Sequence, residues 1–180
     1  MDYVTSADGT RIAFERSGDG PPLVLVHGSI NDRRAWSLAV PAFAEHFSVY
    51  AMDRRGRGES GEPGEHQFAC QIEDVAAVIG AAGAPVDLVG HSYGAHCALG
   101  AAAMAPASIK HLVLYEPPLV DDVRGAVAQA FEQNEASEAV AQFLEKNLQT
   151  RRSRWKRCER RPSLNTWSAS RHRCHRKVAR

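Results

Sequence analysis

Apolar residues fall into short runs that alternate with amphipathic segments over the first two thirds of the chain. Four of these runs, bounded by turn residues, predict buried strands at residues 21–29, 47–53, 86–90 and 109–115. Near the start, Asp8-Gly9 is a two-residue turn signal, and the segment after it alternates through Ile12 and Phe14. This pattern predicts an N-terminal hairpin that precedes the four strands.

Helical periodicity fills the intervals between the predicted strands. Apolar residues at helical spacing predict a helix over residues 67–82, which Gly83 ends, and a helix of small residues over 93–105. Asn31 or Asp32 can cap a further helix that runs to about residue 46. Alternating strands and helices predict the α/β class, with a mostly parallel sheet and helices on both faces.

The pattern changes twice in the last third of the chain. Residues 119–150 show two amphipathic helical segments with no strand between them, and residues 151–180 show neither period. Residues 151–180 hold twelve Lys and Arg against one acid, a charge of +11, whereas residues 1–150 hold ten against twenty, a charge of −10. We therefore expect a core at 1–118, a helical segment at 119–150 and a disordered basic tail at 151–180.

Composition excludes several classes of protein. A chain of 180 residues suits one domain, and its apolar runs are far shorter than a membrane span. The first residues show no signal-peptide pattern, and the four cysteines show no disulfide spacing, so a reduced, cytoplasmic protein is expected. The Cys and His residues of the tail match no zinc pattern, so no metal site is expected.

One motif carries nucleophile chemistry. Residues 90–94 read Gly-His-Ser-Tyr-Gly, a G-x-S-x-G pattern between a predicted strand and a predicted helix. The sharp turn needs Gly90 and Gly94 for steric reasons, and the helix after it directs its first amides at whatever Ser92 attacks. Ser92 is the candidate nucleophile, and the alternative is a structural glycine turn with an incidental serine.

Four segments together resemble the α/β-hydrolase fold superfamily, in its serine hydrolase branch. They are the 90–94 motif and the segments LVLVHGS at 23–29, YAMDRRGRGES at 50–60 and LVLYEPP at 112–118. The likeness covers about residues 2–149 and implies that 119–150 begins a helical cap. Residues 151–180 contain no apolar strand, so the resemblance also implies a truncated fold whose last two strands are missing.

The resemblance assigns roles around Ser92. The backbone amides of Ser29 and Tyr93 would form the oxyanion hole, since these residues follow the His-Gly pair and the nucleophile. Glu116 ends the strand after the motif helix, a position from which some members supply the catalytic acid; the alternative is that it caps the strand or lines the pocket. His27 is expected to brace its loop, and His91 to face away from Ser92.

The implied function is a cofactor-free serine hydrolase that cleaves a small-molecule ester or similar acyl substrate. A serine at position 92 disfavours the dehalogenase and epoxide-hydrolase branches, whose nucleophile is a carboxylate. No base is identified, because His172 and His175 lie in a solvated basic run. Two alternatives remain: a non-catalytic, truncated hydrolase-like protein, and a cofactor-free haloperoxidase-type activity on the same serine.

The basic tail has alternatives of its own. Its arginines, with Trp155 and Trp167 for stacking, could contact nucleic acid or an acidic partner, although no nucleic-acid-binding motif is present and such binding is not expected. The abrupt change of composition favours out-of-frame translation of a longer hydrolase gene. Without the last two strands, residues 112–115 would form an exposed sheet edge through which the chain self-associates.

Overall fold

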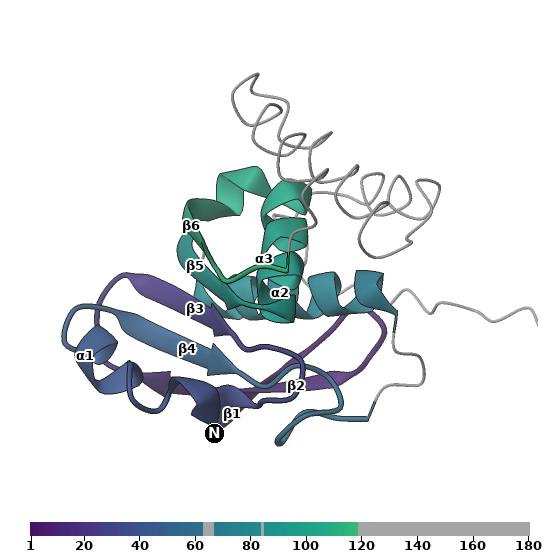
Figure 1. Cartoon of the computed structure of the whole chain (residues 1–180), viewed down its shortest axis with the longest axis horizontal. Coiled ribbons are helices and arrows are strands. Elements are labelled where there is room, and N and C mark those ends of the chain that lie inside the picture. Colours follow the sequence, from purple (N-terminus) through teal and green to yellow (C-terminus); the bar gives the residue numbers. More distant parts are fainter. Residues whose placement is uncertain (63–66, 84, 119–180) are drawn as a thin grey trace, which may run out of the picture.

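A computed structural model describes residues 1–62, 67–83 and 85–118 of the chain (Figure 1). The predicted helical cap, the basic tail and the absence of two final strands concern residues outside this part of the chain. The fold below is that of the described residues.

The described residues form one six-stranded sheet with the order β1-β2-β4-β3-β5-β6. The strands are β1 Asp2–Thr5, β2 Arg11–Ser17, β3 Pro22–Val26, β4 Ser48–Met52, β5 Val86–His91 and β6 Ile109–Tyr115. β1 and β2 pair antiparallel with each other, and β2 pairs antiparallel with β4. The pairs of β3 with β4, β3 with β5 and β5 with β6 are parallel. The predicted mostly parallel sheet is therefore confirmed, and so is the N-terminal hairpin.

Helices cover both faces of this sheet, as predicted. Successive side chains of β3 point to opposite faces, since Val24 and Val26 belong to a large apolar cluster and Leu23 and Leu25 to a small one. The large cluster lies under α2 (Phe68–Ala82) and α3 (Tyr93–Met104), and the small one packs against α1 (Val40–Ala44). Figure 1 shows α1 apart from α2 and α3, which lie together.

The single helix predicted from residue 31 to 46 is wrong. The structure has a 3₁₀ turn η1 (Arg33–Trp36), followed after three residues by α1. Asp32 does cap the first of these, since its carboxylate accepts a hydrogen bond from the Arg34 amide at 2.8 Å. Pro41 explains the break, because proline has no N–H and its ring would clash with the carbonyl four residues earlier. Pro41 stands instead in the first turn of α1.

The other two helices follow the sequence pattern. α2 ends where Gly83 adopts a left-handed conformation, with φ of 81°. α3 contributes a continuous buried run from Gly94 to Ala101, in which most residues are small. A short turn η2 (Pro106–Ser108) then leads into β6.

β6 is less buried than its apolar sequence predicts. Leu112 and Leu114 pack against the large cluster, whereas Val113 and Tyr115 on the opposite side are 52% and 54% exposed. Among the described residues β6 pairs only with β5 and is the last strand of the sheet. The prediction of a buried strand fails for this part of the chain because no described helix covers the second face of β6.

None of the described helices combines the length and the apolar character that crossing a membrane requires.

Candidate active site at the ends of the parallel strands

Ser92 lies in a sharp turn between β5 and α3, as the sequence predicts. Its φ and ψ are 52° and −123°, a conformation that costs a non-glycine residue on the order of 1–3 kcal/mol. A Cβ on Gly90 would lie 2.6 Å from Ala95 Cα, and one on Gly94 would lie 2.4 Å from the carbonyl oxygen of His27. The predicted need for glycine on both sides of Ser92 is therefore confirmed.

The loop after β3 packs directly against this turn. A Cβ on Gly28 would lie 3.3 Å from Ser92 Cβ and also 3.3 Å from His91 Nδ1. His27 is fully buried beneath the loop, where its Nδ1 donates to the Gly28 carbonyl at 2.8 Å and its Nε2 accepts from the Arg54 amide at 3.0 Å. Burial lowers the pKa of His27 to about 4, so the ring is neutral. His27 braces the loop, as expected.

The two predicted oxyanion donors come from these two segments. Ser29 follows Gly28 in the loop after β3, so the structure brings it to the side of the turn that holds Ser92. Tyr93 is the first residue of α3, where a backbone N–H has no partner within the helix and carries the positive end of its dipole. Both amides therefore belong to the surroundings of Ser92, and their role in catalysis remains a prediction.

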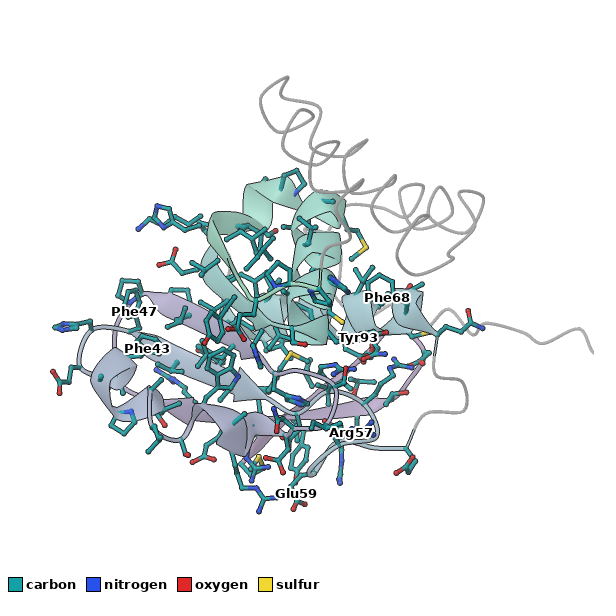
Figure 2. The ribbon with its side chains drawn as sticks, in the orientation of Figure 1. Phe43, Phe47, Arg57, Glu59, Phe68 and Tyr93 are labelled. Carbon is teal, nitrogen blue, oxygen red and sulfur yellow. The ribbon has the colours of Figure 1, made fainter. Side chains whose placement is uncertain are left out.

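The Tyr93 side chain packs against α2 and the loop after β4. Figure 2 shows it beside Phe68, whose ring meets it edge-on at a centroid distance of 5.7 Å. Gln71 Nε2 donates to the Tyr93 hydroxyl at 3.2 Å, and the Arg54 guanidinium stacks 4.5 Å from the ring centroid. Burial raises the pKa of Tyr93 to about 12. Tyr93 can thus serve Ser92 through its backbone alone.

Glu116, the predicted acid, lies at the end of β6, next to the turn that holds Ser92. The strand is connected to Ser92, because the Ser92 amide donates to the Tyr115 carbonyl at 2.9 Å. Glu116 Oε2 lies 3.8 Å from His91 Nε2, and the His91 ring packs 5.2 Å from that of Tyr115. Sequence reasoning missed this contact between His91 and Glu116, and the role of Glu116 as an acid remains a prediction.

The loop after β4 supplies residues that sequence reasoning passed over. Asp53 is fully buried and accepts from the Arg33 amide at 2.8 Å, from Arg33 Nη1 at 2.6 Å and from the Glu59 amide at 2.9 Å. Arg54 and Arg55 are also buried. The only signal was the mixture of arginines and glycines in residues 53–60, which is equally typical of an exposed loop.

A base for Ser92 is not found in the described part of the chain. No histidine there forms a hydrogen bond with the Ser92 hydroxyl, so the base remains unidentified, as it was from the sequence. His172 and His175 lie outside the described residues. Within residues 1–62, 67–83 and 85–118 there is also no group of three His, Cys, Asp or Glu side chains that could hold a metal ion.

Comparison with known proteins identifies the class of this protein. The sequence profile of the alpha/beta hydrolase family matches residues 23–176, most of the chain. The strand order and the strand–turn–helix unit at Ser92 agree with that match. The chain belongs to the alpha/beta hydrolase family.

Relatives with described activities match the chain over only part of their own length. It is 40% identical over 98 residues to a probable oxidoreductase EphD of Mycobacterium tuberculosis, covering 51% of this chain and 17% of that protein. It is 34% identical over 120 residues to the N-formylmaleamate deformylase of Pseudomonas putida, covering 63% of this chain and 44% of that protein. The chain thus spans less than half of either relative.

Solved structures give the same fold. An alpha/beta hydrolase from Sphaerobacter thermophilus superposes with a TM-score of 0.62 at 35% identity, covering 89% of this chain and 66% of the other. The esterase RhEst1 from Rhodococcus superposes with a TM-score of 0.62 at 26% identity, covering 88% of this chain and 68% of the other. Epoxide hydrolases also superpose, and at 23% identity CorEH supports the fold alone.

Proposed function

We propose that this chain is a serine hydrolase that cleaves a small-molecule ester or similar acyl substrate, with Ser92 as nucleophile. One observation carries the proposal: Ser92 has a φ of 52° in a strand-to-helix turn that packs against the loop of Gly28 and Ser29. In a strand–turn–helix motif of this kind the strained turn exposes the serine side chain at the end of the strand, which supports Ser92 as the nucleophile.

The reaction proceeds through a covalent acyl-enzyme. Ser92 Oγ attacks the carbonyl carbon of the substrate, and its proton passes to a base. The amides of Ser29 and Tyr93 donate to the tetrahedral oxyanion, each contributing about 3 kcal/mol of transition-state stabilisation. The alcohol or amine departs with a proton, and water then releases the acid from Ser92.

Two relatives support acyl chemistry. A putative esterase/lipase of Haemophilus influenzae is 31% identical over 97 residues, and RhEst1 is an esterase. A serine at position 92, in place of a carboxylate nucleophile, favours acyl transfer over the chemistry of the epoxide hydrolases among the relatives. The small-molecule substrate and the absence of a cofactor belong to the same proposal, as does Glu116 as the acid that orients the base.

The proposal predicts that Ser92 is acylated slowly, because the described residues supply no base for it. Without a hydrogen-bonded base the hydroxyl stays weakly nucleophilic, but the amides of Ser29 and Tyr93 still stabilise the oxyanion. We expect p-nitrophenyl acetate to place a single acetyl group on Ser92, which peptide mass spectrometry detects. Ser92→Ala should abolish this acetylation, whereas Ser37→Ala, at an exposed serine, should leave it unchanged.

Acetylation that persists in Ser92→Ala, or that spreads over lysines, would contradict the proposal and favour the non-catalytic alternative. Steady turnover that depends on Ser92 would show in addition that the chain supplies a base, and His172→Ala and His175→Ala would be the next variants. Halogenation that depends on peroxide and on Ser92 would replace ester hydrolysis with the haloperoxidase-type alternative.

A further inference from the structure

Arg54 is a buried cation whose partners are all uncharged. The residue is 6% exposed, and its Nε donates to Gln71 Oε1 at 2.9 Å. Its Nη1 donates to the Gly28 carbonyl at 2.8 Å, and the guanidinium stacks on the Tyr93 ring. Among the described residues no carboxylate lies within ion-pair distance of it. A buried charge is costly without compensation, so an arginine in this place calls for an explanation.

The adjacent residue, Arg55, is a buried arginine whose charge is neutralised by carboxylates. Arg55 Nε lies 2.6 Å from Asp74 Oδ2, and its Nη1 lies 2.7 Å from Asp8 Oδ2. These two carboxylates raise the pKa of Arg55 above its usual value. Arg55 therefore holds together the turn of the N-terminal hairpin and α2. Arg54 also reaches α2, through Gln71, but it has no carboxylate partner among the described residues, and its other contacts go to the loop and the ring that adjoin Ser92.

The bond from Arg54 to Gly28 fixes the direction of one peptide group. The Gly28 carbonyl accepts from Arg54 Nη1 and from His27 Nδ1, each at 2.8 Å, and both donors are buried. In a planar trans peptide the N–H points opposite to the C=O. With the Gly28 carbonyl held toward these two buried donors, the Ser29 N–H points away from Arg54 and His27.

We propose that Arg54 is a positioning residue of the oxyanion hole, which orients the Gly28–Ser29 peptide and polarises it with an uncompensated positive charge. The inference rests on the proposed function of Ser92. A charged donor strengthens a hydrogen bond roughly twofold, and hydrogen bonds in series polarise one another, so the Ser29 N–H becomes a better donor. The same guanidinium stacks on Tyr93, the residue whose amide is the second donor. The negative charge that forms during acyl transfer would supply the counterion that Arg54 does not find among the described residues.

The test measures phosphonylation of Ser92 by a fluorophosphonate, because the phosphonyl oxygen occupies the position of the oxyanion. Arg54→Met should lower the second-order rate constant about tenfold to a hundredfold, part of the loss expected when an oxyanion donor is removed. Arg54→Lys should recover part of the rate, since it keeps the charge. Arg16→Met removes the same charge from β2, far from Ser92 in the chain, and should leave the rate unchanged.

A second variant separates charge from folding. Gln71→Glu keeps the shape of the side chain but gives Arg54 a carboxylate partner, and it should slow phosphonylation several-fold while the melting temperature is kept or raised. A purely structural Arg54 would instead give rates that follow the melting temperatures of the four variants. Equal rates in the folded wild type, Arg54→Met and Gln71→Glu would overturn the proposal.

A crystal structure of Arg54→Met tests the geometry without any chemistry at Ser92. We expect the Gly28–Ser29 peptide to rotate in this variant and to keep its orientation in Arg54→Lys. An unmoved peptide in Arg54→Met would refute the positioning role. If the wild type reacts at other residues but not at Ser92, the proposed hydrolase function fails, and the peptide orientation alone then decides the role of Arg54.

Discussion

The ends of β5 and β6 lie side by side, and each carries a residue in an unfavourable conformation. Ser92 after β5 and Glu116 after β6 are the two non-glycine residues with positive φ among those described, at 52° and 47°. Ser92 is enclosed by two glycines against which backbone atoms pack, whereas the Glu116 side chain is 69% exposed. The packing of three segments fixes the first conformation, and far fewer contacts constrain the second.

This difference has a functional meaning within the proposed reaction. A nucleophile gains from a fixed position, because attack requires an alignment that a mobile side chain rarely reaches. Glu116, by contrast, is held within the described part of the chain by little more than the pairing of β6 and its approach to His91. We therefore expect substitutions at the Ser92 turn to have large effects and substitutions at Glu116 to have small ones.

The largest effect is expected for Gly94→Ala. The added Cβ would lie 2.4 Å from the His27 carbonyl oxygen and 2.5 Å from that of Val26, and neither backbone atom can move freely. The free energy of unfolding should fall by about 3 kcal/mol or more in urea denaturation. Gly80→Ala on α2 is the matched control: its Cβ meets no atom within 4 Å, so it should stabilise the helix by about 0.5–1 kcal/mol. Equal effects would mean that the Ser92 turn is not closely packed.

The second largest effect is expected from acid, which should lower the free energy of unfolding through His27, the buried residue beneath the loop that packs against the Ser92 turn. His27 takes up a proton near pH 6.5 in the unfolded chain but only near pH 4 in the native state, so the unfolded state binds more protons between these values. Stability should be complete above pH 6.5 and should fall toward pH 4.5, by up to about 3 kcal/mol for this residue. His27→Gln should flatten the profile in urea denaturation, and His111→Asn, at an exposed histidine, should not. Parallel profiles for wild type and His27→Gln would contradict this.

A moderate effect is expected for a substitution on the exposed edge strand β6, where it should change self-association. Val113 is 52% exposed on the last described strand, where unpaired backbone groups favour pairing with a second copy. Val113→Lys should shift the protein toward monomer in size-exclusion chromatography, because a lysine on an edge strand disfavours such pairing. Asp19→Asn, which changes the net charge by the same +1 at an exposed loop, controls for net charge. A wild type that is already monomeric at high concentration would refute self-association through this edge.

The smallest effect is expected for Glu116→Gly. Glycine adopts positive φ freely, which removes a strain of about 1–2 kcal/mol, but it also increases the entropy of the unfolded chain. The balance should raise the free energy of unfolding by about 0.5–1 kcal/mol, measured in urea. A loss of stability would show that contacts of the Glu116 side chain outweigh its backbone strain.

The sequence predicted the parts of this fold that depend on local pattern. The hairpin at Asp8-Gly9, the four further strands, α2 with its end at Gly83 and the turn at Ser92 all follow from periodicity and glycine placement. The prediction of one continuous helix over 31–46 was wrong because apolar residues at helical spacing do not show that Pro41 interrupts the helix. The apolar content of β6 predicted a buried strand, because apolar content alone cannot show how many neighbours a strand has; an exposed edge was expected only from the missing strands that the family resemblance implies.

The candidate site was predicted less completely than the fold. Ser92, Ser29 and Tyr93 belong to motifs and could be named, although their catalytic roles remain predictions. Arg54 could not be named, since adjacent arginines in a glycine-rich loop are expected in solvent. Only the three-dimensional arrangement shows that one of them is neutralised by Asp74 and Asp8 whereas the other contacts the Gly28 carbonyl.

The hydrogen bond from the Ser92 amide to the Tyr115 carbonyl also has a consequence for the order of folding. Its two ends are connected through the whole of α3 and β6, and the Ser92 turn further needs the carbonyl groups of Val26 and His27 close to Gly94. Contacts between distant parts of a chain form late, because the intervening loop must first be closed. We therefore expect Ser92 to acquire its geometry only after β5 has paired with both β3 and β6. The rate at which a refolding sample regains reactivity at this serine would report the final step of sheet assembly.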